Sequence, residues 1–77
     1  MALTEDMADE IAQLALADEL RTGDEGIIQQ VADILGSSSQ TLQEAFLTSI
    51  RVRRAEKRAR DLLAQRAAKA TPDTPRE

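Results

Sequence analysis

The stretch IIQQVADILGSSSQTLQEAFL, residues 27–47, decides the fold of this chain. Its first half places aliphatic residues on one helical face, at Ile27, Ile28, Val31, Ile34 and Leu35. Gly36 and the three serines after it interrupt this pattern, which indicates a tight turn. Leu42 and Phe46 then begin a second helical pattern. The stretch therefore predicts two helices joined by a short turn.

Capping signals set the bounds of the helix before the turn. Thr22 and Glu25 have the spacing of a capping box, so this helix is expected at about 23–35. Gly36 is expected to end it, because glycine reaches the left-handed conformation without strain.

Two further helices flank this unit. Capping patterns that begin at Ser37 and Thr41 start a helix of about 38–69, since nothing interrupts it before the prolines near the end of the chain. Upstream, an alanine-rich amphipathic pattern predicts a helix at about 5–21. The tail, residues 70–77, has two prolines and no apolar anchor, so we expect it to be disordered.

The composition favours a small helical domain. The chain has 77 residues, no cysteine, no histidine and one aromatic residue, Phe46. A core of leucine, isoleucine, valine and alanine suits close helix packing, so we expect an all-α fold with a single domain, residues 1–69. A chain this short buries only about 60% of its unfolded surface. Without disulfides or the common zinc sites, it is expected to gain stability as a homo-oligomer.

The net charge of −4 conceals a strong asymmetry along the sequence. Residues 1–35 hold nine acidic residues and a single base, Arg21. Residues 51–69 instead hold eight bases and two acids, Glu56 and Asp61. The two parts of the chain therefore attract each other, and each repels the same part of another copy.

The apolar face of the predicted third helix turns along its length. At about 100° per residue, the inward-facing residues from Leu42 to Ile50 fall on one face, and the buried face rotates by roughly 90° for the apolar residues beyond Arg51. The first half is expected to pack on the two preceding helices, while the second half needs another partner. Its apolar positions, which fit a heptad pattern of mostly small residues, are Val52, Ala55, Ala59 and Leu62. We predict that they form an oligomer or partner interface.

The turn region resembles the helix-turn-helix DNA-binding proteins. In that family a small residue lies midway along the first helix, a glycine occupies the turn, and an aliphatic residue anchors the second helix. Ala32, Gly36 and Leu42 stand at matching separations, and Phe46 is expected to complete the hairpin core. The residue after the glycine departs from the pattern, because Ser37 replaces the usual aliphatic residue.

The positions that would face DNA in such a unit carry no arginine or lysine. They are Ser39, Gln40, Gln43, Glu44 and Leu47. A carboxylate repels phosphates, although glutamine can bind adenine and glutamate can accept a hydrogen bond from cytosine. The unit is therefore either a DNA reader or a well-capped helical hairpin, and sequence-specific base readout is the less favoured role.

A basic segment follows directly, and its cations flank the apolar positions on both sides. They are Arg51, Arg53, Arg54, Lys57, Arg58 and Arg60. Long cationic side chains can cover the edges of a helix interface, and they can also neutralise DNA phosphates. Ion pairing with the acidic first helix is a third role. We predict DNA contact, mainly independent of sequence, through these six residues.

Short helices, a turn and a long helix with basic flanks are together similar to the small terminase subunits of tailed phages and of gene transfer agents. The resemblance is one of architecture and composition and includes no diagnostic motif. It implies an oligomeric protein that recognises DNA or feeds it to a separate large terminase subunit, which carries the ATPase and nuclease.

Other classes of function find little support in the residues. A chain without histidine, cysteine or a glycine-rich phosphate loop is not expected to be an enzyme or to bind a cofactor or metal. No apolar run reaches the length of a membrane span, and the N-terminus is acidic, so we expect a cytoplasmic protein without a membrane partner.

The leading hypothesis is a non-enzymatic, oligomeric, DNA-associated module, most concretely a small terminase-like subunit. The alternative is a helical adaptor or transcription regulator that binds a partner protein, such as a transcription component, instead of DNA. RNA binding is less favoured, because the chain lacks aromatic residues for base stacking.

Overall fold

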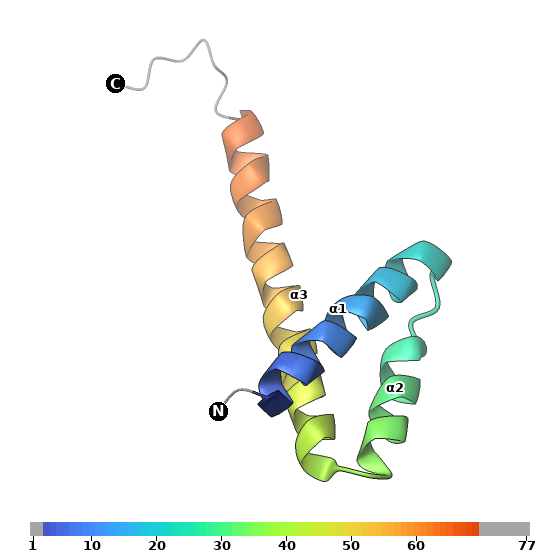
Figure 1. Ribbon diagram of the computed structural model, residues 1–77. Helices are drawn as coiled ribbons and strands as arrows, with labels where there is room; N and C mark the ends of the chain where they lie inside the picture. Colours follow the sequence, from blue (N-terminus) through green and yellow to red (C-terminus); the bar gives the residue numbers. More distant parts are fainter. Residues whose placement is uncertain (1–2, 70–77) are drawn as a thin grey trace.

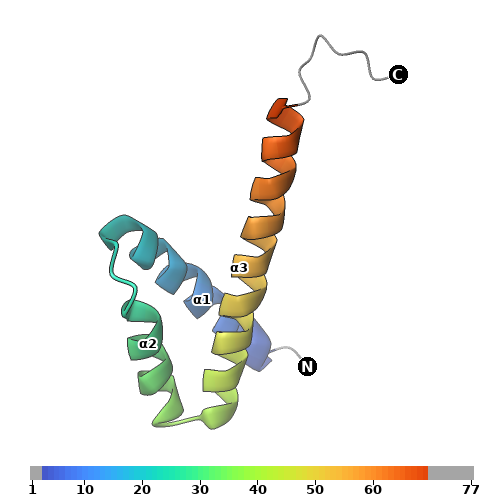
Figure 2. The same ribbon diagram turned by 180° about the vertical axis from the view of Figure 1, so that it is seen from behind.

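The computed structural model describes residues 3–69 and confirms the all-α prediction, with three helices (Figure 1). α1 spans Leu3–Thr22, α2 spans Ile27–Gly36 and α3 spans Gln40–Lys69. α2 and the first half of α3 form an antiparallel hairpin, and α1 crosses the first half of α3 obliquely (Figures 1 and 2). The tail predicted to be disordered, residues 70–77, lies outside the described residues.

The end of α1 is set by a threonine and a glycine. Thr22 is the last helical residue, and its Oγ1 donates a hydrogen bond to the carbonyl oxygen of Asp18 at 2.8 Å. Gly23 follows with a φ of 77° and donates its N–H to the carbonyl oxygen of Glu19 at 2.7 Å. This left-handed conformation suits glycine and ends the helix. The predicted capping box at Thr22 is wrong, because this residue closes α1 instead of opening α2.

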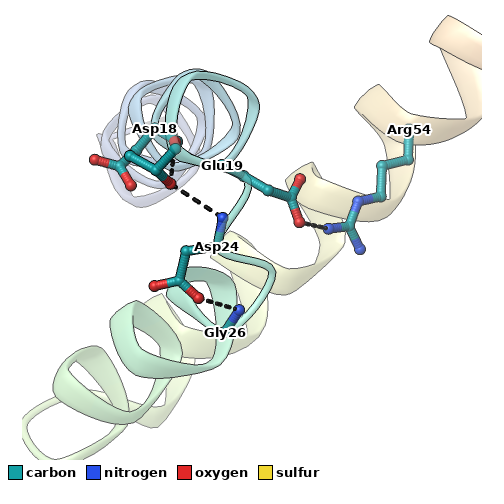
Figure 3. Close-up of polar contacts among 6 residues, drawn as sticks. Asp18, Glu19, Asp24, Gly26 and Arg54 are labelled. Atoms are coloured by element: carbon teal, nitrogen blue, oxygen red, sulfur yellow. Dashed lines mark hydrogen bonds and ion pairs between the residues drawn. The ribbon is translucent and has the colours of Figure 1, made fainter.

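α2 starts at Ile27, four residues later than predicted, because Asp24 organises the intervening turn. The Asp24 carboxylate accepts a hydrogen bond from the N–H of Gly26 at 2.9 Å (Figure 3). The carbonyl oxygen of Asp24 accepts from the N–H of Ile27 at 3.4 Å. Gly26, the N-cap residue, has no side chain with which to cap the helix. An aspartate two residues before the N-cap therefore directs the chain into α2.

Gly36 does not act as the predicted left-handed stop. It is the last residue of α2, and the chain leaves the helix through Ser37 at a φ of −69°. The reason for glycine lies across the hairpin, where a Cβ on Gly36 would come within 2.7 Å of Cδ of Gln43. The Gln43 amide donates to the carbonyl oxygen of Ala32 at 2.9 Å. Gly36 thus makes room for a side chain that ties α3 to α2.

A single serine starts α3. The Oγ of Ser39 accepts a hydrogen bond from the N–H of Leu42 at 3.1 Å, which is the geometry of an N-cap. Ser37 serves the other helix, since its Oγ donates to the carbonyl oxygen of Ile34 at 2.7 Å. The predicted start at residue 38, with caps at Ser37 and Thr41, is therefore corrected to Gln40 with Ser39 as the cap.

The core joins small residues of α1 to larger ones of α2 and α3. Its buried members are Ala8, Ala12, Ala15, Ile28, Ala32, Phe46 and Ile50. Alanines on the inner face of α1 let its backbone approach the other two helices closely. Of the larger aliphatic residues of α1, Ile11 and Leu16 pack partly against this core, whereas others point outward, and Leu14 is 72% exposed. Ile34, which the sequence pattern placed on the apolar face of α2, is 70% exposed because burial centres on Ile28 and Ala32.

The second half of α3 extends beyond the other two helices (Figures 1 and 2). Phe46 and Ile50 are buried, whereas every residue from Ala55 to Lys69 is exposed. The predicted turn of the apolar face and the lack of a partner for this half within the described chain are thus confirmed. The molecule is correspondingly long and flat, 56 × 32 × 13 Å along its principal axes.

Candidate functional site

The hairpin residues that resemble a helix-turn-helix unit are engaged in packing. Ala32 and Phe46 are buried, and Leu42 is half-buried against the same core. Gln43, one of the positions that would face DNA, donates its amide to the carbonyl oxygen of Ala32 instead. A base contact by Gln43 would require this hydrogen bond to break. The turn consequently offers few groups for reading DNA.

The extended half of α3 carries an exposed apolar row. The predicted interface residues Val52, Ala55, Ala59 and Leu62 form what we call the α3 seam. At about 100° per residue they fall within a sector of roughly 80°, on the side of α3 opposite Phe46 and Ile50. Val52 and Leu62 are 60% and 56% exposed, and Leu63 at the edge of the seam is 65% exposed. Such a contiguous apolar face on a small domain typically marks an interaction surface.

Arg53 is ion-paired with α1, which is the third of the roles considered for the basic segment. Its Nε and Nη2 donate to the two carboxylate oxygens of Asp9, each at 2.7 Å. Both side chains are about one-third exposed. The hydrogen bond from Arg53 lowers the pKa of Asp9, and the same contact raises the pKa of Arg53. This bidentate ion pair fastens the N-terminal half of α1 to the middle of α3.

Arg54 makes the second link to α1. Its Nη2 donates to Oε2 of Glu19 at 3.0 Å (Figure 3). The sequence indicated an attraction between the acidic first helix and the basic third helix, but it could not identify Asp9 and Glu19 as the partners. Only the crossing of α1 over α3 brings these pairs together, because Asp9 and Arg53 are 44 positions apart.

Two more of the predicted DNA-binding cations pair along α3 itself. Lys57 donates to Asp61 at 2.8 Å, and Arg60 donates to Glu56 at 2.8 Å. Both are exposed i, i+4 pairs, which are worth little and exchange readily with other partners. The cations remain accessible, but each has a carboxylate that competes with an incoming phosphate.

The remaining bases of α3 lie on one side of the helix. Arg51, Arg58, Arg66 and Lys69 make no ion pair with any residue between 3 and 69. By helix geometry they fall within a sector of roughly 80° that overlaps the α3 seam. Neither Glu56 nor Asp61 falls in this sector. The seam is therefore an apolar row with an uncompensated positive margin.

A cleft of about 680 Å³ opens where the C-terminal part of α1 leaves α3. Leu16 and Leu20 line it on α1, and Arg54, Lys57 and Arg58 line it on α3. This space could not be predicted from the sequence, because it results from the angle at which the two helices cross. It leaves Arg58 accessible from the cleft as well as from the seam.

Neither a metal site nor a membrane helix is found in the described part of the chain. Acidic side chains between residues 3 and 69 do not gather in groups of three or more with a spacing suited to a metal ion. None of α1, α2 and α3 combines the length and apolarity that crossing a bilayer requires.

Comparison of the chain with protein-family models, with curated proteins and with solved structures found no match.

Proposed function

We propose that this protein is a non-enzymatic, oligomeric, DNA-associated module that acts in the cytoplasm, most concretely as a small terminase-like subunit. The observation that carries the proposal is the extended half of α3. It contributes nothing to the core formed by residues 3–69, yet it combines the α3 seam with cations that have no ion-pair partner among these residues.

The α3 seam favours self-association on energetic grounds. The buried core is small and contains a single aromatic residue. Burial of apolar surface stabilises by about 25 cal/mol per Å², and Val52, Leu62 and Leu63 remain largely exposed in the single chain. A helix that protrudes without packing is marginal in water, so contact with another copy would stabilise both the helix and the domain.

The cations of α3 support DNA contact to different degrees. Arg51 and Arg58 have no internal ion pair within residues 3–69 and can neutralise phosphates directly. Arg53 and Arg54 would have to leave carboxylates of α1 first. Contact through phosphates is independent of base sequence and weakens steeply with salt. Such contact suits a protein that presents DNA to a large terminase subunit.

DNA binding is tested by the salt dependence of duplex affinity. The double variant Arg51→Ala/Arg58→Ala should weaken binding and reduce the slope of log K against log salt by about 1.8, since each phosphate contact contributes roughly 0.9. The matched control, Lys57→Ala/Arg60→Ala, removes the same charge from residues already paired with carboxylates and should have a smaller effect. Unchanged affinity and slope in the first variant would reject DNA contact through this face.

The seam also favours a second candidate, a helical adaptor or transcription regulator whose partner is another protein. An apolar row with a positive margin fits an acidic amphipathic helix. A wild-type protein that stays monomeric and shows no salt-dependent affinity for a duplex would favour this role over the first.

A further inference from the structure

The outer face of α1 carries an exposed apolar row of its own. Leu3, Met7, Glu10 and Leu14, which we call the α1 stripe, recur at intervals of four and three residues, the spacing of a heptad. Leu3, Met7 and Leu14 are 64%, 44% and 72% exposed. By helix geometry the stripe occupies a sector of roughly 60° on the side of α1 away from the buried alanines. These residues do not contribute to the core.

The charge of the α1 stripe is opposite to that of the α3 seam. Glu10 lies within the stripe and Asp6 borders it, and neither forms an ion pair or a side-chain hydrogen bond within the described chain. The one base of α1, Arg21, lies beyond the stripe and is paired with Asp18 at 2.6 Å. Arg58 and Arg66, at the margin of the seam, are equally uncompensated. The two surfaces also match in length, about 17 Å for the stripe and about 15 Å for the seam.

Like surfaces of two copies do not fit each other. A contact of seam with seam would bring together two helix halves that each carry eight bases and only two acids. A contact of stripe with stripe would oppose acids with acids. Like charges across an interface disfavour a complex, whereas a stripe against a seam joins opposite charges along two apolar rows.

The stripe and the seam of one molecule cannot meet. The inner face of α1 packs on the core through Ala8, Ala12 and Ala15, and Asp9 holds the helix against α3 through Arg53. The stripe consequently points away from the α3 of its own chain. Neither surface therefore has an occupant among residues 3–69 of its own chain.

We infer that the α1 stripe of one copy docks on the α3 seam of the next copy. This inference rests on the proposed self-association and names its two surfaces. Each copy uses its stripe to contact one neighbour and its seam to contact another. The contact is therefore heterologous and generates a closed ring or an open filament instead of a two-fold dimer. Four of the eight bases of residues 51–69 have no ion pair within residues 3–69. The stripe brings only Asp6 and Glu10 to Arg58 and Arg66, so Arg51 and Lys69 stay available to DNA.

The test uses two charge-reversed variants of the full chain. Variant one, Asp6→Lys/Glu10→Lys, makes the stripe basic and leaves the seam intact. Variant two, Arg58→Glu/Arg66→Glu, makes the seam acidic and leaves the stripe intact. All four positions are exposed, so both variants should keep the helical circular dichroism spectrum of the wild type. Their mass is then measured by light scattering at low salt.

We expect the wild type to form assemblies larger than a dimer and each variant alone to lose at least about tenfold in association. An equimolar mixture should regain the assemblies, since the acidic stripe of variant two fits the basic seam of variant one, and the reverse. A control with the same change of net charge away from the stripe, Glu5→Lys/Glu25→Lys, should assemble like the wild type.

The alternatives give different results. If copies met seam to seam, variant one would assemble like the wild type and variant two would assemble more strongly. This result would overturn the inferred contact but would leave the proposed self-association intact. A monomeric wild type would overturn both. A wild type that assembles but does not bind a DNA duplex would reject only the DNA part of the proposed function.

Discussion

At the scale of single residues, the contact between Gly36 and Gln43 explains why glycine ends α2. A side chain at position 36 would displace the Gln43 amide from the carbonyl oxygen of Ala32, to which it donates at 2.9 Å. The loss of such a hydrogen bond costs about 0.5–1.5 kcal/mol. Replacing a helical glycine by alanine contributes up to about 1 kcal/mol in the opposite direction.

The two residues should therefore be coupled. In the wild type, we expect Gly36→Ala to change the free energy of unfolding little, because the lost hydrogen bond offsets the gain in helix propensity. In the Gln43→Ala background, the same change should stabilise by about 1 kcal/mol. Urea denaturation of the four proteins gives the coupling. If the two effects simply add, the contact does not explain the glycine.

The ion pair of Asp9 with Arg53 makes part of the stability depend on pH. The hydrogen bond from Arg53 lowers the pKa of Asp9 in the folded protein below its unfolded value of about 3.9. A lowered folded pKa means that the contribution is complete above about pH 4 and is lost as the pH falls through the folded pKa.

Asp9→Asn should accordingly lower the melting temperature at pH 7 and lower it less at pH 2. Thermal unfolding followed by circular dichroism at both pH values measures the difference. Glu5→Gln is the control, because Glu5 is exposed, lies away from the α1 stripe and has no ion-pair partner between residues 3 and 69. An equal effect of Asp9→Asn at both pH values would show that the charge of Asp9 does not hold α1 on α3.

At the scale of helices, the sequence predicted the number of helices correctly but was less accurate on the residues at which they begin and end. Periodicity of apolar residues specifies a helix, and all three helices lie where it indicated. The ends depend on which of several competing hydrogen-bonding side chains finds a donor. Thr22 had the spacing of a cap, but its hydroxyl donates to the carbonyl oxygen of Asp18 in α1 and accepts from the N–H of Asp24. Asp24 instead organises the start of α2. Sequence spacing alone could not separate these two outcomes.

The sequence predicted which residues make up the candidate site but not which of its cations form ion pairs. The apolar row and the cations of α3 follow from helical periodicity, and the exposure of Val52 and Leu62 agrees with it. The division of the cations into paired and unpaired ones does not follow. Arg53 and Arg54 are neutralised by α1 only because of the angle at which α1 crosses α3, and that angle depends on how closely three alanines pack.

At the scale of the whole molecule, the charge split along the chain has two consequences. Within one chain, Asp9 and Glu19 of the acidic helix hold the basic helix at its middle. Beyond that point α3 diverges from α1, and the unmatched charges of both helices face outward together with exposed apolar side chains. The same asymmetry that folds the domain thus leaves two complementary surfaces for other molecules.

Stability should consequently depend on protein concentration. Assembly stabilises a folded chain by mass action, so the melting temperature of the wild type should rise with concentration at low salt.

Val52→Ser/Leu62→Ser alters residues that are exposed in the single chain, and at high dilution it should change the free energy of unfolding by no more than about 0.5 kcal/mol. The rise with concentration should nevertheless disappear, because the seam has lost its apolar row. Ile34→Ser, which alters an equally exposed residue away from the seam and the stripe, should leave the rise intact. If the double variant keeps the concentration dependence, α3 does not assemble through this face.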